Sequence, residues 1–417
     1  MISKSQLRAI SSSVKSSLLP IYGRPPNVFV RGEGCWLYDS DGKKFLDFTA
    51  GIAVNALGHN HKNVVELVSD QVKKIIHLSN LYHNEYAEGL AQRMVQSLKD
   101  DPKLNKAQVF FSNTGTEANE GAFKFARKYA KSTFPNQDKF EIISFSHAFH
   151  GRTMGALSAT PNLKYQKPFF PLLPGFKTLP FNDIEALESI TTETCAVIIE
   201  PIQGEGGIHP VNSEFFSRLR QKCDETGALL IADEIQCGVG RTGKMYGFTN
   251  FGSSPDIITM AKPLANGLPL GAIVLTPKVA ATISPGDHGT TFGGSPITTR
   301  VGQYVWDTVS DPKFLLHVNE IGEYMKSNLE NLAKASPIIK EVRGLGLLLG
   351  IELRDNVPTK IFVDTCHQHG LLVVSAGSNT IRVIPPLNIT KSEVDQGIKL
   401  LETVIYSVES TIALGKQ

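Results

Sequence analysis

Short apolar runs alternate with longer amphipathic stretches between about residue 60 and residue 300. Apolar side chains spaced three and four apart over residues 64–76 predict a helix. Short runs, apolar and often β-branched, predict buried strands at 108–111, 141–145, 196–199, 228–232, 257–260 and 272–275. Strands buried on both faces and separated by helices are typical of a mainly parallel sheet. The pattern therefore predicts an α/β domain whose sheet is covered by helices.

The pattern changes after about residue 300, where long helical stretches surround three extended ones at 342–353, 371–374 and 380–384. This arrangement predicts a smaller α+β domain. We expect a large domain over residues 61–300, a small C-terminal domain over 301–417, and an N-terminal segment, 21–60, that packs with the small domain.

The first twenty residues are basic, rich in serine and free of acidic side chains. Leu7, Ile10, Val14 and Leu18 would share one face of a helix. This composition is typical of an organellar transit peptide and predicts import into the mitochondrial matrix. The alternative is a frayed basic N-terminus of a cytosolic protein.

Composition and charge narrow the classes of function. Apolar residues make up 41% of the chain, yet no uninterrupted apolar run approaches the ~18 residues that a membrane span needs. The net charge is +2, and residues 1–20 carry part of it, so the charge argues against a nucleic-acid partner. Five scattered cysteines without a CxxC pair argue against disulfides or a zinc site and favour a reducing compartment.

Candidate chemistry follows three of the predicted strands. In open α/β sheets, ligands bind beyond the carboxyl ends of the strands. The polar turn 112–118 comes after the first strand, where Gly115 and Thr116 would open a helix and hold a phosphate. The alternative is a plain helix cap.

An acid and an amine follow two further strands. Asp233 ends one apolar run, and Lys262 comes just after another and precedes a loop containing glycine. Taken singly, a salt-bridge acid and a surface lysine are the simpler explanations. Together with the phosphate turn, they supply what pyridoxal phosphate needs: a lysine for its aldehyde and an acid for its ring nitrogen.

Two other patterns point to different chemistry. Residues 238–243 match G-x-G-x-x-G, the dinucleotide fingerprint of a nicotinamide oxidoreductase. The fingerprint requires its first glycine at the strand end and a helix directly afterwards. Here residues 233–237 separate the strand from the first glycine, and residues 244–248 do not continue as an amphipathic helix. The histidine pairs at 59 and 61 and at 147 and 150 lack a nearby cysteine or acid at ligand spacing, so no metal site is expected.

Five motifs in order resemble the class-III, fold-type-I pyridoxal-phosphate aminotransferases: residues 49–59, 112–120, 147–153, 200–207 and 233–243. The resemblance extends from about Leu18 to the C-terminal helix. It implies a fold with a large and a small domain, pyridoxal 5'-phosphate as cofactor, small-molecule substrates, and a homodimer whose active sites lie at the subunit interface. A catalytically silent relative that serves as a scaffold is disfavoured because the lysine, the acid and the phosphate turn are intact.

The resemblance also assigns roles to cofactor-binding residues. It implies that Lys262 bonds covalently to the cofactor and moves a proton, and that Asp233 pairs with the ring nitrogen. The remaining positions would enclose the ring, its phenolic oxygen and its phosphate, with Thr291 reaching across from a second subunit: Phe149, Ile235, Gln236, Gly115, Thr116 and Thr291.

Four substrate-binding residues are implied in the same way. Thr290 and Arg152 would contact substrate, and Arg382 would clamp an α-carboxylate, as a bidentate guanidinium can. Glu205 would pair with Arg382 when the terminal amine of the donor must face the cofactor.

Within the family, residues 51–54, 78–80, 195–197 and 236–238 favour the members that act on N2-acetylornithine. The implied reaction transfers the terminal amino group to 2-oxoglutarate in reversible ping-pong halves. Ornithine δ-aminotransferase, 4-aminobutyrate aminotransferase and glutamate-semialdehyde mutase share the same lysine, acid and phosphate turn, and remain alternatives.

Overall fold

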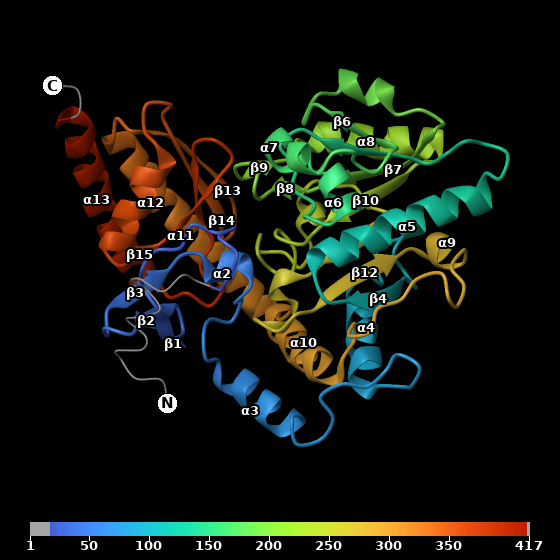
Figure 1. Cartoon of the computed structure of the whole chain (residues 1–417), viewed down its shortest axis with the longest axis horizontal. Helices are drawn as coiled ribbons and strands as arrows, with labels where there is room; N and C mark the ends of the chain where they lie inside the picture. Colours follow the sequence, from blue (N-terminus) through green and yellow to red (C-terminus); the bar gives the residue numbers. More distant parts are fainter. Residues whose placement is uncertain (1–16, 415–417) are drawn as a thin grey trace.

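A computed structural model describes residues 17–414, which form three principal sheets flanked by helices (Figure 1). The largest sheet has seven strands, in the spatial order β4-β12-β11-β10-β7-β5-β6. Their bounds are Gln108–Ser112 (β4), Glu141–Phe145 (β5), Phe176–Leu179 (β6), Thr194–Ile199 (β7), Leu229–Asp233 (β10), Ile257–Met260 (β11) and Gly271–Leu275 (β12).

Six of these strands run in the same direction, and β12 runs against them, pairing antiparallel with both β11 and β4. The mainly parallel sheet and the six strands expected from the sequence are confirmed, with shifts at their ends. The prediction from the sequence did not include β6. This edge strand has exposed central residues and therefore lacks a continuous apolar run.

Helices cover both faces of this sheet. On one face, α5 (Gly115–Thr133) packs its alanine-rich side against alternate strand residues such as Ile142, Ile198 and Ile231. On the other face, α8 (Ser213–Thr226) packs Phe215 and Leu219 against the residues in between. Each central strand is thus buried on both sides, as its continuous apolar sequence indicates.

The remaining elements of this part are short or lie at the periphery. The helices are α2 (Ala50–Ala53), α3 (Lys62–Gln71), α4 (Glu85–Ser97), α6 (Met154–Ser158), α7 (Leu163–Gln166), α9 (Pro277–Ala280) and α10 (Pro296–Val309). A two-stranded ladder joins β8 (Ile202–Gln203) to β9 (His209–Pro210), and single 3-10 turns lie at Lys167–Phe169, Glu185–Ser189, Gly247–Asn250 and Lys262–Ala265.

A second, antiparallel sheet has the order β13-β14-β17-β16: Ile339–Leu345, Leu348–Leu353, Thr380–Val383 and Val374–Ala376. Long helices flank it: α11 (Pro312–Ala335), α12 (Thr359–Gln368) and α13 (Lys391–Leu414). The single extended stretch expected over 342–353 is two strands, because the chain reverses at Gly346, which has a φ of +55°.

The N-terminal strands lie beside this C-terminal part, as the blue and red-orange ribbons of Figure 1 show. β1 (Phe29–Glu33), β2 (Trp36–Asp39) and β3 (Lys44–Asp47) form an antiparallel meander. β15 (Leu371–Leu372) joins the meander by pairing parallel with β3.

One helix differs from its prediction, and another cannot be compared. The helix expected over residues 64–76 ends at Gln71, and Val72, Ile75 and Ile76 are 45–55% exposed. Their apolar spacing is therefore not explained by packing within one chain. The helical face expected over residues 7–18 lies almost wholly outside the described residues. In the described part of the chain, no helix is long and apolar enough to cross a membrane.

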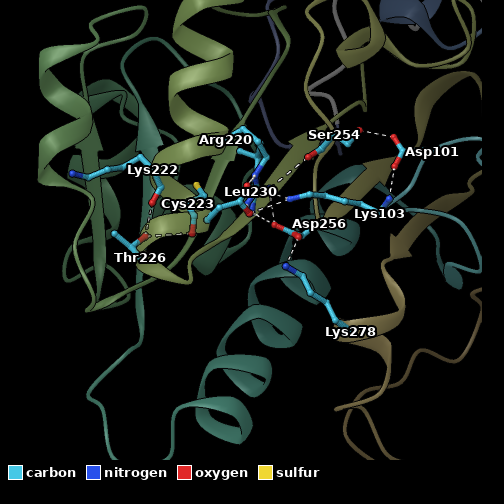
Figure 2. A network of polar contacts seen from close by, with 11 residues as sticks. Asp101, Lys103, Arg220, Lys222, Cys223, Thr226, Leu230, Ser254, Asp256 and Lys278 are labelled. Atoms are coloured by element: carbon cyan, nitrogen blue, oxygen red, sulfur yellow. Dashed lines mark hydrogen bonds and ion pairs between the residues drawn. The ribbon is translucent and has the colours of Figure 1, made fainter.

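A buried ionic network holds the edge of the large sheet where β10 and β11 begin (Figure 2). The Asp256 carboxylate lies 2.7 Å from Arg220 and 2.6 Å from Lys278, and it accepts the backbone N–H of Leu230. Burial alone would raise the pKa of Asp256, but the two cations outweigh it and lower that pKa. The opposite edge, where the parallel strands end, is the edge that carries candidate chemistry.

Candidate active site

A cavity of about 390 Å³ opens where β4, β10 and β11 end. Its size is in the range of small-molecule sites. The structure brings eight of the predicted residues to its wall: Gly115, Thr116, Phe149, Arg152, Asp233, Ile235, Gln236 and Lys262. These side chains come from segments far apart in the sequence.

The first turn of α5 forms one side of the cavity. Thr114 caps the helix by accepting the backbone N–H of Glu117, and the Glu117 side chain bonds back to the cap. Thr116 Oγ1 lies 2.9 Å from Thr153 Oγ1, so two hydroxyls gather at the helix N-terminus. A Cβ at Gly115 would come within 2.8 Å of the Ile235 side chain, so the close approach requires glycine here. The Thr153 hydroxyl also donates to Glu120 at 2.6 Å. A helix N-terminus with a hydroxyl beside it favours an anion such as phosphate.

Asp233 is buried at the end of β10 and is held by three donors. Its Oδ2 atom lies 2.7 Å from His150 Nδ1 and accepts the Asn119 side-chain amide at 2.8 Å. Its Oδ1 atom accepts the backbone N–H of Ile235 at 3.1 Å. These bonds offset part of the cost of burying a carboxylate and fix its orientation toward the cavity.

The sequence interpretation missed both of these supporting side chains. Asn119 lies one turn into α5 and also accepts a hydrogen bond from Thr259 on β11, so it ties the helix to the sheet beneath the acid. His150 was considered only as a metal ligand. The only signal in the sequence for either side chain was its position within a family motif, 112–120 for Asn119 and 147–153 for His150.

Lys262 follows β11 on a short 3-10 turn, with a backbone φ of +32°. Left-handed conformations are unfavourable for residues other than glycine and are found where surrounding contacts hold them. Asn266 supplies such contacts, because its side chain accepts the Leu57 N–H at 2.8 Å and donates to the Gly58 carbonyl at 3.1 Å.

The amine of Lys262 has a lowered pKa. Burial is the main cause, since it disfavours the charged ammonium, and the positive charge of Arg382 acts in the same direction. The carboxylates of Glu205, Glu200 and Asp233 act in the opposite direction. A neutral amine is the nucleophilic form, so this setting favours covalent chemistry with a carbonyl.

Glu200 is a second buried acid at a strand end, after β7, and the sequence interpretation gave it no role. It accepts the backbone N–H of Phe149 at 2.9 Å and that of Gly204 at 3.0 Å. Burial and the nearby Asp233 raise the pKa of Glu200 to about 7, against the opposing charge of His150. By holding the Phe149 backbone, Glu200 sets the position of an aromatic ring at the cavity wall.

Arg382, on β17 of the antiparallel sheet, is 2% exposed. Its Nη1 atom lies 2.8 Å from Glu205 Oε1 and donates to Gln236 Oε1 at 3.2 Å, and its Nη2 donates to the Ser375 carbonyl at 3.2 Å. Gln236 therefore connects this guanidinium to the cavity that contains Lys262. The ion pair covers a group that would otherwise attract a carboxylate.

The predicted substrate-binding residues Arg152 and Thr290 and the predicted phosphate-binding residue Thr291 differ in their placement. Arg152 stacks 3.5 Å from the centre of the Tyr165 ring at the cavity wall. Thr290 accepts a hydrogen bond from the Asn113 side chain at 3.1 Å. Thr291 is exposed and is not part of the cavity wall of its own chain.

The competing sequence patterns adopt other structures. Residues 238–243 form a loop that begins five residues after β10 and leads only to the turn Gly247–Asn250, which is the outcome expected from their spacing. His59 lies 2.8 Å from Asp47, away from the cavity wall.

The model of the aminotransferase class-III family matches residues 22–405. The chain belongs to the class-III aminotransferases. It is 48% identical to the mitochondrial acetylornithine aminotransferase of Debaryomyces hansenii, over 95% of this chain and 86% of that one. The solved N-acetylornithine aminotransferase of Stenotrophomonas maltophilia has a TM-score of 0.80 at 34% identity, covering 92% and 97% of the two chains. The ornithine aminotransferase of Toxoplasma gondii has a TM-score of 0.90 at 28% identity, covering 99% and 97%.

Class-III aminotransferases use pyridoxal phosphate, and the residues of this cavity fit that cofactor. A buried amine of lowered pKa suits the aldehyde, a helix N-terminus with two hydroxyls suits the phosphate, and a buried carboxylate suits a protonated ring nitrogen. The enzyme is therefore a transaminase that depends on this cofactor.

Proposed function

We propose that this aminotransferase moves the terminal amino group of N2-acetyl-L-ornithine to 2-oxoglutarate. The products are N-acetyl-L-glutamate 5-semialdehyde and L-glutamate, and the reaction belongs to arginine biosynthesis. The ion pair between Arg382 and Glu205 carries the argument. With Arg382 covered, a donor has to place its carboxylate elsewhere, and a distant amine then faces Lys262. Relatives named for acetylornithine, at 42–48% identity, support the choice of donor.

The proposal gives each cofactor-binding residue the role that the family resemblance implies, and the placement of most of them in the cavity wall supports it. Lys262 Nζ would hold the aldehyde of the cofactor until the amine of the donor replaces it, Asp233 would pair with the ring nitrogen, and Gln236 would lie near the phenolic oxygen. Phe149 and Ile235 would enclose the ring. Gly115 and Thr116 would bind the phosphate, together with Thr291 of a second copy of the chain. When bound, pyridoxal phosphate supplies an aldehyde that takes up the amino group and a ring that withdraws electrons from the adjacent carbon.

The side chains of the enzyme move one proton and orient two substrates. Lys262 Nζ takes a proton from the carbon that bears the donor's terminal amine and returns it on the cofactor side. Arg152, assisted by Thr290, binds the carboxylate of the donor. In the second half of the reaction, Glu205 leaves Arg382, whose two N–H groups then clamp the α-carboxylate of 2-oxoglutarate.

A homodimer completes the site. Exposed apolar residues gather around the segment that carries Thr290 and Thr291: Ile76 is 55% exposed, Leu81 87% and Phe292 63%. Asn80 donates to the Thr290 carbonyl at 3.0 Å, and His77 packs against Phe292, which makes this one continuous surface. A second copy that covers it would bury these side chains and bring its own Thr291 to the phosphate.

Domain boundaries and location are part of the same proposal. The N-terminal segment 21–60 packs with the small domain, which comprises residues 301–417, and residues 61–300 form the large domain. Residues 1–20 direct the enzyme to the mitochondrial matrix and are then removed, as the word mitochondrial in the names of several relatives supports.

Glutamate formation by the purified enzyme tests the proposed function. With 2-oxoglutarate as acceptor, we expect N2-acetylornithine to give a higher kcat/KM than ornithine or 4-aminobutyrate, because a pocket shaped for an uncharged acyl amide disfavours a charged α-amine. The Lys262→Ala variant, loaded with the same cofactor, serves as the inactive control. A preference for ornithine or 4-aminobutyrate would overturn the choice of donor but not the transaminase chemistry.

A further inference from the structure

The loop over residues 204–209, which carries Glu205, has an unfavourable backbone. Gly207 has a φ of +123° and Ile208 a φ of +59°. Ile208 is fully buried, and a β-branched residue with positive φ is a genuine outlier that persists only when surrounding contacts hold it. Some contact must therefore keep this loop in place.

Arg343, on β13 of the antiparallel sheet, makes those contacts. Its Nε atom donates to the Gly207 carbonyl at 2.9 Å and to the Ile208 carbonyl at 3.1 Å, and its Nη2 donates to Gly207 at 2.6 Å. One guanidinium thus binds both residues with positive φ. On its other side, Arg343 pairs with Glu341 and Glu352, which fix the guanidinium to its own sheet.

The same sheet supports Arg382. Arg343 Nη2 donates to Thr380 Oγ1 at 2.8 Å, and Thr380 lies on β17, two residues before Arg382. Gly377 N–H donates to the Glu205 carbonyl at 2.7 Å. Both members of the ion pair, Glu205 and Arg382, are therefore held by contacts with the antiparallel sheet and its loops, although Glu205 belongs to a different part of the chain.

A cavity of about 630 Å³ lies beside Glu205, between its loop and residues 375–380. It gives the Glu205 side chain, which is 29% exposed, room to leave Arg382 while the backbone stays in place. The position of the loop backbone thus sets how well Glu205 covers Arg382 between such departures.

We infer that Arg343 is a positioning residue that holds the Glu205 loop so that Glu205 covers Arg382, and so limits binding of carboxylates to Arg382. The inference rests on the proposed function, in which Arg382 receives the α-carboxylate of the keto acid. Loosening the loop would make Arg382 more accessible to dicarboxylates and would weaken the preference for donors whose amine is far from the carboxylate.

Binding of glutarate to the cofactor-loaded enzyme, measured by isothermal titration calorimetry, tests this inference. Glutarate has the two carboxylates of 2-oxoglutarate but no keto group, so it binds without reacting. In Arg343→Lys the positive charge beside Glu341 and Glu352 remains, but one ammonium cannot reproduce the fork that binds two carbonyls. We expect about tenfold tighter binding of glutarate than in the wild type.

Three further variants make the outcome specific. Glu205→Ala should also tighten binding, and adding Arg343→Lys to it should change nothing, because no carboxylate is left to position. Arg354→Lys is the matched control, since Arg354 lies in the same domain and its side chain donates to the Pro337 carbonyl rather than to the Glu205 loop. Thr380→Val, which removes one anchor of Arg343, replaces Arg343→Lys if that variant does not fold.

Different results would contradict the inference about Arg343 and the proposed role of Arg382. Glutarate binding that depends on Arg382 but is unchanged by Arg343→Lys, or equally changed in the Glu205→Ala background, would overturn the inference alone. Binding that is insensitive to Arg382→Lys would overturn both the inference and the proposed role of Arg382.

Discussion

The Nδ1 atom of His150 lies 2.7 Å from the Oδ2 atom of Asp233, and both side chains are almost fully buried. A carboxylate in such a place tends to take up a proton unless donors stabilise its charge. His150 and Asn119 supply two such donors on Oδ2. Oδ1 accepts the backbone N–H of Ile235 and keeps a second lone pair, which we propose receives the N–H of the cofactor ring.

This pair gives a first prediction. Asp233→Asn should lower kcat by about a thousandfold or more, because the ring nitrogen loses its charged partner. His150→Ala should lower kcat by about ten- to a hundredfold, whereas His150→Asn, whose amide can replace Nδ1–H, should retain most of the activity. Steady-state kinetics on cofactor-saturated enzyme would measure all three. Equal losses in the two His150 variants would contradict a role through hydrogen bonding to Asp233.

Gly115 gives a second prediction. A methyl group there meets Ile235 at 2.8 Å, next to the helix terminus that we propose binds the phosphate. Gly115→Ala should therefore weaken binding of pyridoxal phosphate by about tenfold or more, measured by titration of cofactor-free enzyme. Gly23→Ala is the control, because nothing lies within 4 Å of a Cβ at that position. Unchanged cofactor affinity in Gly115→Ala would show that the phosphate lies elsewhere.

The charges around Lys262 give a third prediction. Arg382 lowers the pKa of the Lys262 amine and Glu205 raises it. In cofactor-free enzyme, the rate at which the visible band appears on adding pyridoxal phosphate should rise with pH as the amine loses its proton. The midpoint should move to higher pH in Arg382→Met and to lower pH in Glu205→Gln. Shifts of the same sign in both variants would disprove this electrostatic account.

Glu234 gives a fourth prediction, on stability. Its carboxyl group is buried and accepts the backbone N–H groups of Gly247 and Phe248, and burial raises its pKa to about 7. In the unfolded chain its pKa is about 4.3, so between these values the folded state binds more protons than the unfolded state. The free energy of unfolding therefore falls as pH rises through this window.

Glu234→Gln removes this titration, so the stability of the variant relative to the wild type should increase between about pH 5 and about pH 8. Thermal unfolding of both proteins at several pH values measures the difference. A difference that does not vary with pH would mean that Glu234 is not protonated in the folded enzyme.

Features that depend on one local segment could be predicted from the sequence, and those that depend on tertiary contacts could not. Asp233 and Lys262 were found because each follows a continuous apolar strand, and the ends of neighbouring strands meet at one edge of the sheet. The roles of Arg382 and Glu205 came only from the family resemblance, because neither residue stands out locally.

Side chains that act on the backbone of distant segments were missed altogether. Glu200 holds Phe149, and Arg343 holds Gly207, through contacts that no pattern in one sequence records. The edge strand β6 was missed for a similar reason, since its half-exposed residues lack the apolar run of the central strands.

The visible absorption spectrum of the cofactor-loaded enzyme, recorded before and after adding N2-acetylornithine without any keto acid, tests the central claim most directly. We predict a visible band that requires Lys262 and that disappears as the amino group passes from the donor to the cofactor, and its return on adding 2-oxoglutarate. A band that N2-acetylornithine leaves unchanged would contradict the proposed donor. The absence of any visible band after incubation with pyridoxal phosphate would contradict the role of Lys262.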